Sequence, residues 1–226
     1  MIRINHLARL NARLGYGHLG GMTATDDSDK SSDQNSGSKN TSFAVIHLPP
    51  GDRSLAGTMQ EGGDFMSAQL AGVDLTEGDF YWASFHNARL ERAILVRCDL
   101  RGAIFNGANL RHADLSRANA GNDNLGGSTH FVGADLSGAD LRFAELAGAN
   151  FTSAVLVGAD LSGARAASPA QGRPTCFKGA NLTDARLRGA ELTGAVFDEN
   201  TIFPSGFTPE RVGMVPTRRR KSRKTK

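Results

Sequence analysis

Cysteine is scarce in this chain, with only Cys98 and Cys176 among 226 residues. Two cysteines far apart in unlike sequence contexts do not make the dense framework of a small disulfide-stabilised secreted domain. We therefore expect a reducing compartment. The cytoplasm is the first expectation, and an organelle or the nucleus is the alternative if the cell is eukaryotic.

Long apolar runs are also missing. No run approaches the ~18 residues needed to span a bilayer, and no apolar core of a secretory signal peptide is visible. Near the start, Leu7, Leu10 and Leu14 share one helical face, and no acidic residue occurs before Asp26. This pattern predicts a short amphipathic helix over residues 2–14, which is either a targeting segment or a helix that docks on the rest of the protein.

The residue patterns of known catalytic sites are absent too. None of the six histidines stands at metal-ligand spacing to another histidine or to a cysteine. Residues 15–20 match G-x-G-x-x-G, but a polar tract follows where a nucleotide site would need a helix. We predict that the protein is not an enzyme and holds no metal or cofactor.

What the chain has in abundance is a five-residue repeat centred on Leu or Phe. Among 25 centres, 24 are Leu or Phe, and the residue two positions earlier is mostly Ala, so that the consensus is Ala-Asp/Asn-Leu/Phe-x-x. The first run extends from Phe65 to Leu125, and later runs begin at Phe131 and Phe177. Self-similarity at a fixed period indicates a solenoid.

A period of five fits neither a helix nor a strand. It fits a square coil with five residues per side, in which the centre and the small residue two positions earlier both point inward. Phe65, Phe85 and Phe105 follow one another at intervals of four repeats, which is one turn of such a coil. Stacked coils would then place Phe over Phe, about 4.8 Å apart as in paired strands.

The repeats resemble those of the pentapeptide-repeat family. The resemblance covers residues 63–199 and is carried by stretches such as Ala-Asp-Leu-Ser-Gly at residues 134–138 and Ala-Asn-Leu-Thr-Asp at residues 180–184. It implies an all-β fold, a right-handed quadrilateral parallel β-helix. Some members of the family are DNA mimics that bind type II topoisomerases, so the resemblance leaves function open.

Composition divides the chain into five segments. We predict a disordered segment over residues 1–42, a capping strand over 43–53, the β-helix over 54–200, a C-terminal cap over 201–216 and a disordered basic tail over 217–226. In the cap, Phe203, Phe207, Val212 and Met214 are expected to cover the last coil.

Two places interrupt the repeat. Six residues instead of five separate Leu125 from Phe131, which we interpret as a one-residue bulge. Residues 166–176 break the pattern outright and contain Pro169 and Pro174, which lack the N–H of a ladder residue. We interpret this stretch as a loop extruded from one corner.

Acidic residues recur just before the centres. If the interruption near Leu125 is a one-residue bulge, then Asp79, Asp99, Asp140 and Asp160 stack on one wall together with Asn119. Such a row of carboxylates resembles a phosphate backbone and makes these aspartates candidate partner-binding residues. The alternative, which we prefer, is that Asp and Asn suit corners because their side chains bond to nearby backbone.

Two further surface features are candidates for binding. Tyr81 and Trp82 are expected to point outward, where aromatic side chains can anchor a partner, although lone surface aromatics are common. The tail carries a run of cations that would attract nucleic acid, acidic lipid or an import receptor, unless it is simply solvated or folds back on the acidic rod. These cations are Arg218, Arg219, Arg220, Lys221, Arg223 and Lys224.

The function predicted from these features is that of a rigid, non-catalytic scaffold that binds protein partners. The alternative is a DNA-mimicking inhibitor or protector of a type II topoisomerase.

Overall fold

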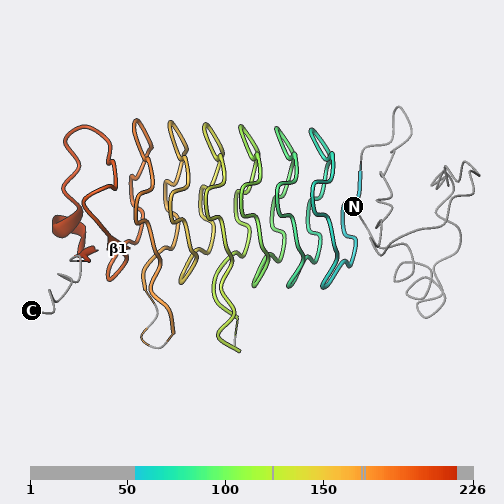
Figure 1. Cartoon of the computed structure of the whole chain (residues 1–226), viewed down its shortest axis with the longest axis horizontal. Helices are drawn as coiled ribbons and strands as arrows, with labels where there is room; N and C mark the ends of the chain where they lie inside the picture. Colours follow the sequence, from blue (N-terminus) through green and yellow to red (C-terminus); the bar gives the residue numbers. More distant parts are fainter. Residues whose placement is uncertain (1–53, 124, 169, 171, 218–226) are drawn as a thin grey trace, which may run out of the picture.

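The computed structural model describes residues 54–217, except residues 124, 169 and 171. The predicted amphipathic helix, the capping strand and the cations of the tail lie outside these residues. The described chain winds into a rod of stacked square coils (Figure 1), which confirms the right-handed quadrilateral β-helix. No helix among the described residues is long and apolar enough to cross a membrane.

Parallel bridges join each coil to the next and define four walls. The bridges link the outward residues that precede the centres, and over the first coils their partners stand four repeats apart, as in Ser54–Asp74. Wall A bears Asp74, Ile94, Asp114, Asp140, Asp160 and Arg186; wall B bears Asp79, Asp99, Asn119, Glu145, Arg165 and Glu191; wall C bears Ser84, Ile104, His130, Asn150, Cys176 and Val196; and wall D bears Arg89, Asn109, Asp135, Val155 and Asn181.

A tight turn at each corner explains why the repeat has five residues. The carbonyl of a centre accepts a hydrogen bond from the N–H three residues later, as from Ala68 to Phe65 at 3.0 Å. The second residue after the centre has positive φ, for example +65° at Gly107 and +56° at Trp82. Glycine adopts this conformation without strain, which explains its frequency at these positions.

The core is one side chain wide. Centres such as Leu110 and small residues such as Ala113 have no exposed surface. Six phenylalanines form a continuous stack with ring centroids 4.7–5.2 Å apart and planes within 9° of parallel. They are Phe65, Phe85, Phe105, Phe131, Phe151 and Phe177. The expected stacking of Phe over Phe is therefore present.

The C-terminal end of the rod is closed by the chain itself. Strand β1 (Val196–Phe197) pairs in parallel with β2 (Val215–Pro216), and the 3₁₀ helix η1 (Pro209–Val212) connects to β2 through a left-handed Gly213. Met214 is buried against the last coil, with Phe203 and Phe207 partly buried beside it. Val212, expected to join them, is instead exposed. Thr217 donates its N–H and its hydroxyl to the carbonyl of Phe197, so it belongs to this cap.

Candidate functional site

Two loops leave the rod at the same corner, between walls B and C. The bridges Ile104–His130 and Asn150–Cys176 each span six residues more than the four repeats of an ordinary coil. Asn122 and Ser168 still donate ordinary ladder bonds, to Ala147 and Thr193. The first loop therefore comprises residues 123–128 and the second loop residues 169–174. Figure 1 shows both projecting from one edge, with one loop-free coil between them.

Each loop ends at a buried threonine that restores the coil. Thr129 and Thr175 occupy the inward position two residues before a Phe centre and have no exposed surface. Their hydroxyls donate to the carbonyls of Leu100 at 2.8 Å and Leu146 at 3.3 Å. The Thr175 hydroxyl also accepts the N–H of Gly148 at 2.8 Å. These bonds satisfy buried backbone groups where the loop interrupts the ladder.

The predicted one-residue bulge is wrong. The first loop inserts six residues, which is one residue more than the length of one repeat. In the sequence, the spacing of the centres therefore shifts by one residue only, as it would for a one-residue bulge. Leu125, counted as an inward centre, lies in this loop and is 84% exposed. In the irregular stretch 166–176, Ala166 is instead a buried centre, and Cys176 pairs with Asn150 in the ladder.

Asp123 fastens the first loop to a coil that lies two coils earlier in the chain. Its Oδ2 accepts hydrogen bonds from the Tyr81 hydroxyl at 3.0 Å and the Trp82 indole N–H at 2.9 Å. Its Oδ1 accepts the backbone N–H groups of Leu125 and Gly127. Burial raises the pKa of Asp123, but these hydrogen bonds outweigh it and hold the pKa below its ordinary value. We call this arrangement the Asp123 clasp.

The clasp gives the aromatic pair a structural role. Trp82 is 48% exposed, in agreement with an outward position, and its ring packs against Gly102 and Gly127. A Cβ at Gly127 would come within 2.6 Å of the indole. The polar ends of Tyr81 and Trp82 thus hold the loop, while part of the indole remains available to a partner.

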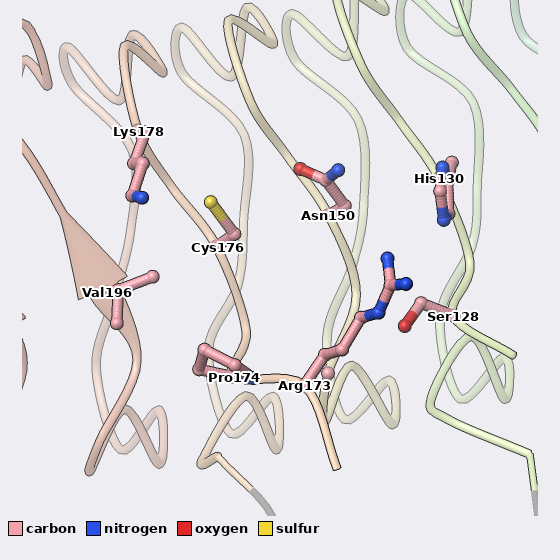
Figure 2. Close-up of a pocket in the computed structure, with 9 residues that line it drawn as sticks. Ser128, His130, Asn150, Arg173, Pro174, Cys176, Lys178 and Val196 are labelled. Atoms are coloured by element: carbon pink, nitrogen blue, oxygen red, sulfur yellow. The ribbon is translucent and has the colours of Figure 1, made fainter. Parts of the chain in front are cut away.

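A hollow of about 190 Å³ lies on wall C beside the two loops and extends past the second one to Lys178 and Val196 (Figure 2). Three of its wall residues are His130, Asn150 and Cys176, which are successive ladder partners. Arg173 of the second loop extends over the wall toward Asn150 and Ser128, and Lys178 lies beyond Cys176. The second loop thus forms one rim of a small polar basin.

The described residues that line the basin include two cations, Arg173 and Lys178, and no carboxylate. From Ser84 to Val196, the outward residues of wall C include no carboxylate. The side chains of Arg173 and Lys178 form no ion pair or hydrogen bond with any other described residue. Burial, and secondarily the charge of Arg173, lower the pKa of His130, so its imidazole is neutral near pH 7.

The predicted acidic wall does not exist as one row. Asp79 and Asp99 stand on wall B, whereas Asp140 and Asp160 stand on wall A above Asp114. The cause is the six-residue insertion, which leaves every later residue one side earlier in the coil than a one-residue bulge would. Wall B continues instead with Glu145, Arg165 and Glu191.

The aspartates are also engaged locally. The Oδ1 atoms of Asp79, Asp99, Asp140 and Asp160 each accept the N–H two residues later, at 2.9–3.2 Å. Arg101 and Arg142 pair with Asp99 and Asp140, and Arg186 lies 3.5 Å from Asp160. This is the corner role expected of Asp and Asn, and the paired arginines break up the negative field.

Arg173, Lys178, His130 and Asn150 were not among the candidate residues. One signal was present, because the spacing from Ala120 to Phe131 equals that from Ala166 to Phe177. Each insertion follows an alanine centre and precedes a repeat in which threonine stands two residues before the Phe centre. Two insertions of equal length in the same context indicate that both leave the rod at the same corner.

The family model for pentapeptide repeats matches in eight copies, over residues 64–102, 83–119, 129–165 and 175–202. These ranges cover more than half of the chain and leave both loops unmatched. The chain therefore belongs to the pentapeptide-repeat family. No curated protein matches the sequence.

Solved structures of pentapeptide-repeat proteins are similar to parts of the chain. HetL from the cyanobacterium Nostoc sp. strain PCC 7120, involved in heterocyst differentiation regulation, is 29% identical over 66% of this chain and 78% of its own, with a TM-score of 0.33. A thylakoid-lumen protein from Arabidopsis thaliana is 27% identical over 44% of this chain and 62% of its own, with a TM-score of 0.30. QnrB1, a plasmid-mediated fluoroquinolone resistance protein, is 18% identical over 62% and 71%, with a TM-score of 0.33.

Proposed function

We propose that the protein is a non-catalytic scaffold that binds a protein partner through the corner between walls B and C. The observation that carries this proposal is that both insertions project from that one corner and flank wall C. The interior is filled by Leu, Phe and Ala side chains, so binding must use the outer surface. Loops held on a rigid frame are the usual place for recognition.

The exposed groups at this corner suit recognition. Leu125 is the most exposed large apolar side chain among the described residues, and the indole of Trp82 lies nearby against the base of the same loop. Aromatic and apolar anchors surrounded by polar groups are typical of binding hot spots. The Asp123 clasp limits the motion of the loop, which lowers the entropy cost of binding.

Excision of the loops tests this proposal. Deleting residues 123–128 or 169–174 restores the four-repeat spacing and leaves Asn122 and Ser168 with their ladder bonds. A partner recovered with the full chain should bind each deletion variant more weakly when both are purified. Ile94→Ser on wall A is the matched control, because Ile94 is 38% exposed and lies on another face.

Unchanged affinity in both deletion variants would refute this binding face. Turnover of a substrate by the purified chain would refute the absence of catalysis.

The DNA-mimic alternative has weaker support, because its four candidate aspartates are divided between two walls and three of them face arginines. A gyrase supercoiling assay separates the two functions, since a mimic inhibits supercoiling and a scaffold for another partner does not.

The basic tail remains a proposed site for anionic partners. Deleting residues 218–226, which keeps Thr217 in the cap, should abolish nucleic-acid retention without changing rod stability. Retention should also fall steeply with salt, in proportion to the phosphates contacted. If the deletion variant still retains nucleic acid, the tail is not the binding site.

A further inference from the structure

We propose that the basin on wall C is a binding site for a phosphate monoester group, with Arg173 and Lys178 as its charged ligands. The inference deepens the proposed function, since it names the chemistry of a group that this face receives. The group is carried either by a small molecule or by a phosphorylated side chain of the partner.

Most arginines of the described rod pair with a carboxylate, whereas Arg173, like Arg92, Arg117 and Arg188, does not. Seven arginines of the described rod pair with carboxylates; they are Arg89, Arg97, Arg101, Arg111, Arg142, Arg165 and Arg186. Arg173 pairs with none of the described acids, although acids outnumber bases on this rod. It extends instead over the hollow, whose described lining also includes a second cation, Lys178, on the far side of Cys176, and no carboxylate.

The charge of the basin matches a phosphate monoester. Such a group carries about −1.5 to −2 near pH 7, and Arg173 with Lys178 supplies two positive charges. The guanidinium presents a fork of N–H donors that fits two phosphate oxygens. A neutral carboxylic ester or an amide would leave both cations uncompensated.

Neutral groups complete the site. Asn150 accepts hydrogen bonds from the backbone N–H and the hydroxyl of Thr152 at Oδ1, so its Nδ2 is the group with which this lining residue can donate to a ligand. His130 can donate one ring N–H, and its neutral form avoids a third positive charge in the empty basin. The hollow of about 190 Å³ has room for the phosphate and the first atoms of its ester.

Cys176 supplies a built-in reporter of this basin. It lines the hollow, whereas the other cysteine, Cys98, is fully buried, and burial raises the pKa of its thiol to about 12. Thiol reagents should therefore modify Cys176 alone in the folded protein. The modification rate reports both the local potential and any ligand that covers the sulfur.

The first measurement compares an anionic reagent, 5,5′-dithiobis(2-nitrobenzoate), with neutral N-ethylmaleimide at one fixed pH. Arg173→Gln should lower the anionic-to-neutral rate ratio about three- to tenfold, from the Coulomb energy of one charge a few ångströms away. Lys178→Gln should act in the same direction. Arg188→Gln, which removes an exposed arginine that pairs with none of the described acids, is the matched control and should leave the ratio unchanged.

The second measurement adds ligands to the N-ethylmaleimide reaction. Inorganic phosphate should slow modification of Cys176 in the unaltered chain and not in Arg173→Gln, whereas sodium chloride at equal ionic strength should not. A phosphoserine peptide compared with its unphosphorylated form tests whether a modified side chain is received as well as the free ion. Protection by phosphate alone assigns the site to a small molecule.

Equal phosphate protection in the unaltered chain and in Arg173→Gln, or no protection in either, would overturn the site. Circular dichroism of each variant checks that the rod is folded. The basin can fail this test while a protein partner still depends on the loops, and the reverse also holds, so the two proposals are separable.

Discussion

The two loops have the same length and leave the same corner, yet they are held differently. The first loop is tied down by Asp123, which accepts hydrogen bonds from Tyr81 and Trp82 two coils away. The second loop has no such clasp among its described residues, and its Arg173 reaches across wall C instead. The charged side chain of the first loop, Asp123, therefore holds that loop in place. The charged side chain of the second loop, Arg173, remains available to a ligand.

This difference shows which part of the design is general and which is particular. The backbone solution is shared, because both loops follow an alanine centre and end at a buried threonine. Side chains then decide whether a loop becomes a fixed projection or the rim of a site. A six-residue insertion at the same corner thus forms a fixed projection in one coil and the rim of the basin in another.

The largest expected effect comes from the core that carries both loops. Leu110→Asp should prevent folding, because burying an unpaired carboxylate among fully buried side chains costs more free energy than the net stability of a folded protein. Leu110→Ala should cost about 2–5 kcal/mol and remain folded. Circular dichroism and chemical denaturation measure both. A folded Leu110→Asp rod would contradict a single continuous core.

The buried threonines should differ from one another. Thr129→Val removes a hydroxyl that donates to Leu100 and should cost about 1 kcal/mol. Thr175→Val also strands the N–H of Gly148 and should cost about 1–3 kcal/mol more. Urea denaturation of the two variants measures the gap. Equal losses would mean that the two loops are closed in equivalent ways.

Asp123→Ala should release the first loop and leave the second unchanged. Trp82 is the only tryptophan, so its emission should shift to longer wavelength as the indole loses its partner. Proteolysis within residues 123–128 should accelerate, while Arg173→Gln, as the matched control on the other loop, should show neither effect.

The pH dependence of the clasp follows from the sign of the Asp123 shift. The hydrogen bonds favour the carboxylate, so the folded pKa lies below the unfolded value. Their stabilisation is present above the unfolded pKa and is lost as pH falls through the folded one. The emission shift of the unaltered chain should appear only below about pH 4, and Asp123→Ala should lack that transition.

The smallest expected effect concerns His130. Burial is the main cause of its lowered pKa and Arg173 the second, so Arg173→Gln should raise the pKa partly toward its ordinary value. Arg173, Cys176 and Lys178 are the other titratable groups that line the basin. Proton NMR titration of the imidazole measures the shift, with Arg188→Gln as control. An unchanged pKa would place Arg173 away from the basin.

The five-residue period was enough to predict the coil, the inward centres and the phenylalanine stack, because each depends on local spacing alone. The wall assignment of Asp140 was not predictable in this way. An inserted loop of six residues and a slip of one residue leave the repeat in the same phase, and only the pairing of Asp114 with Asp140 distinguishes them. The partners of Asp123 were equally hidden, since Tyr81 and Trp82 lie two coils earlier in the chain.

The sequence by itself determined the fold, since every fifth residue must be large and apolar for a coil of this width to exclude water from its interior. The tertiary structure alone decided which residues share a surface. Bridges between coils set the register, and a single insertion rotates all later residues by one side. The basin of His130, Asn150, Arg173 and Lys178 exists only because the bridges stack His130, Asn150 and Cys176 on one wall and the second loop leaves the corner beside it, which places Arg173 over that wall.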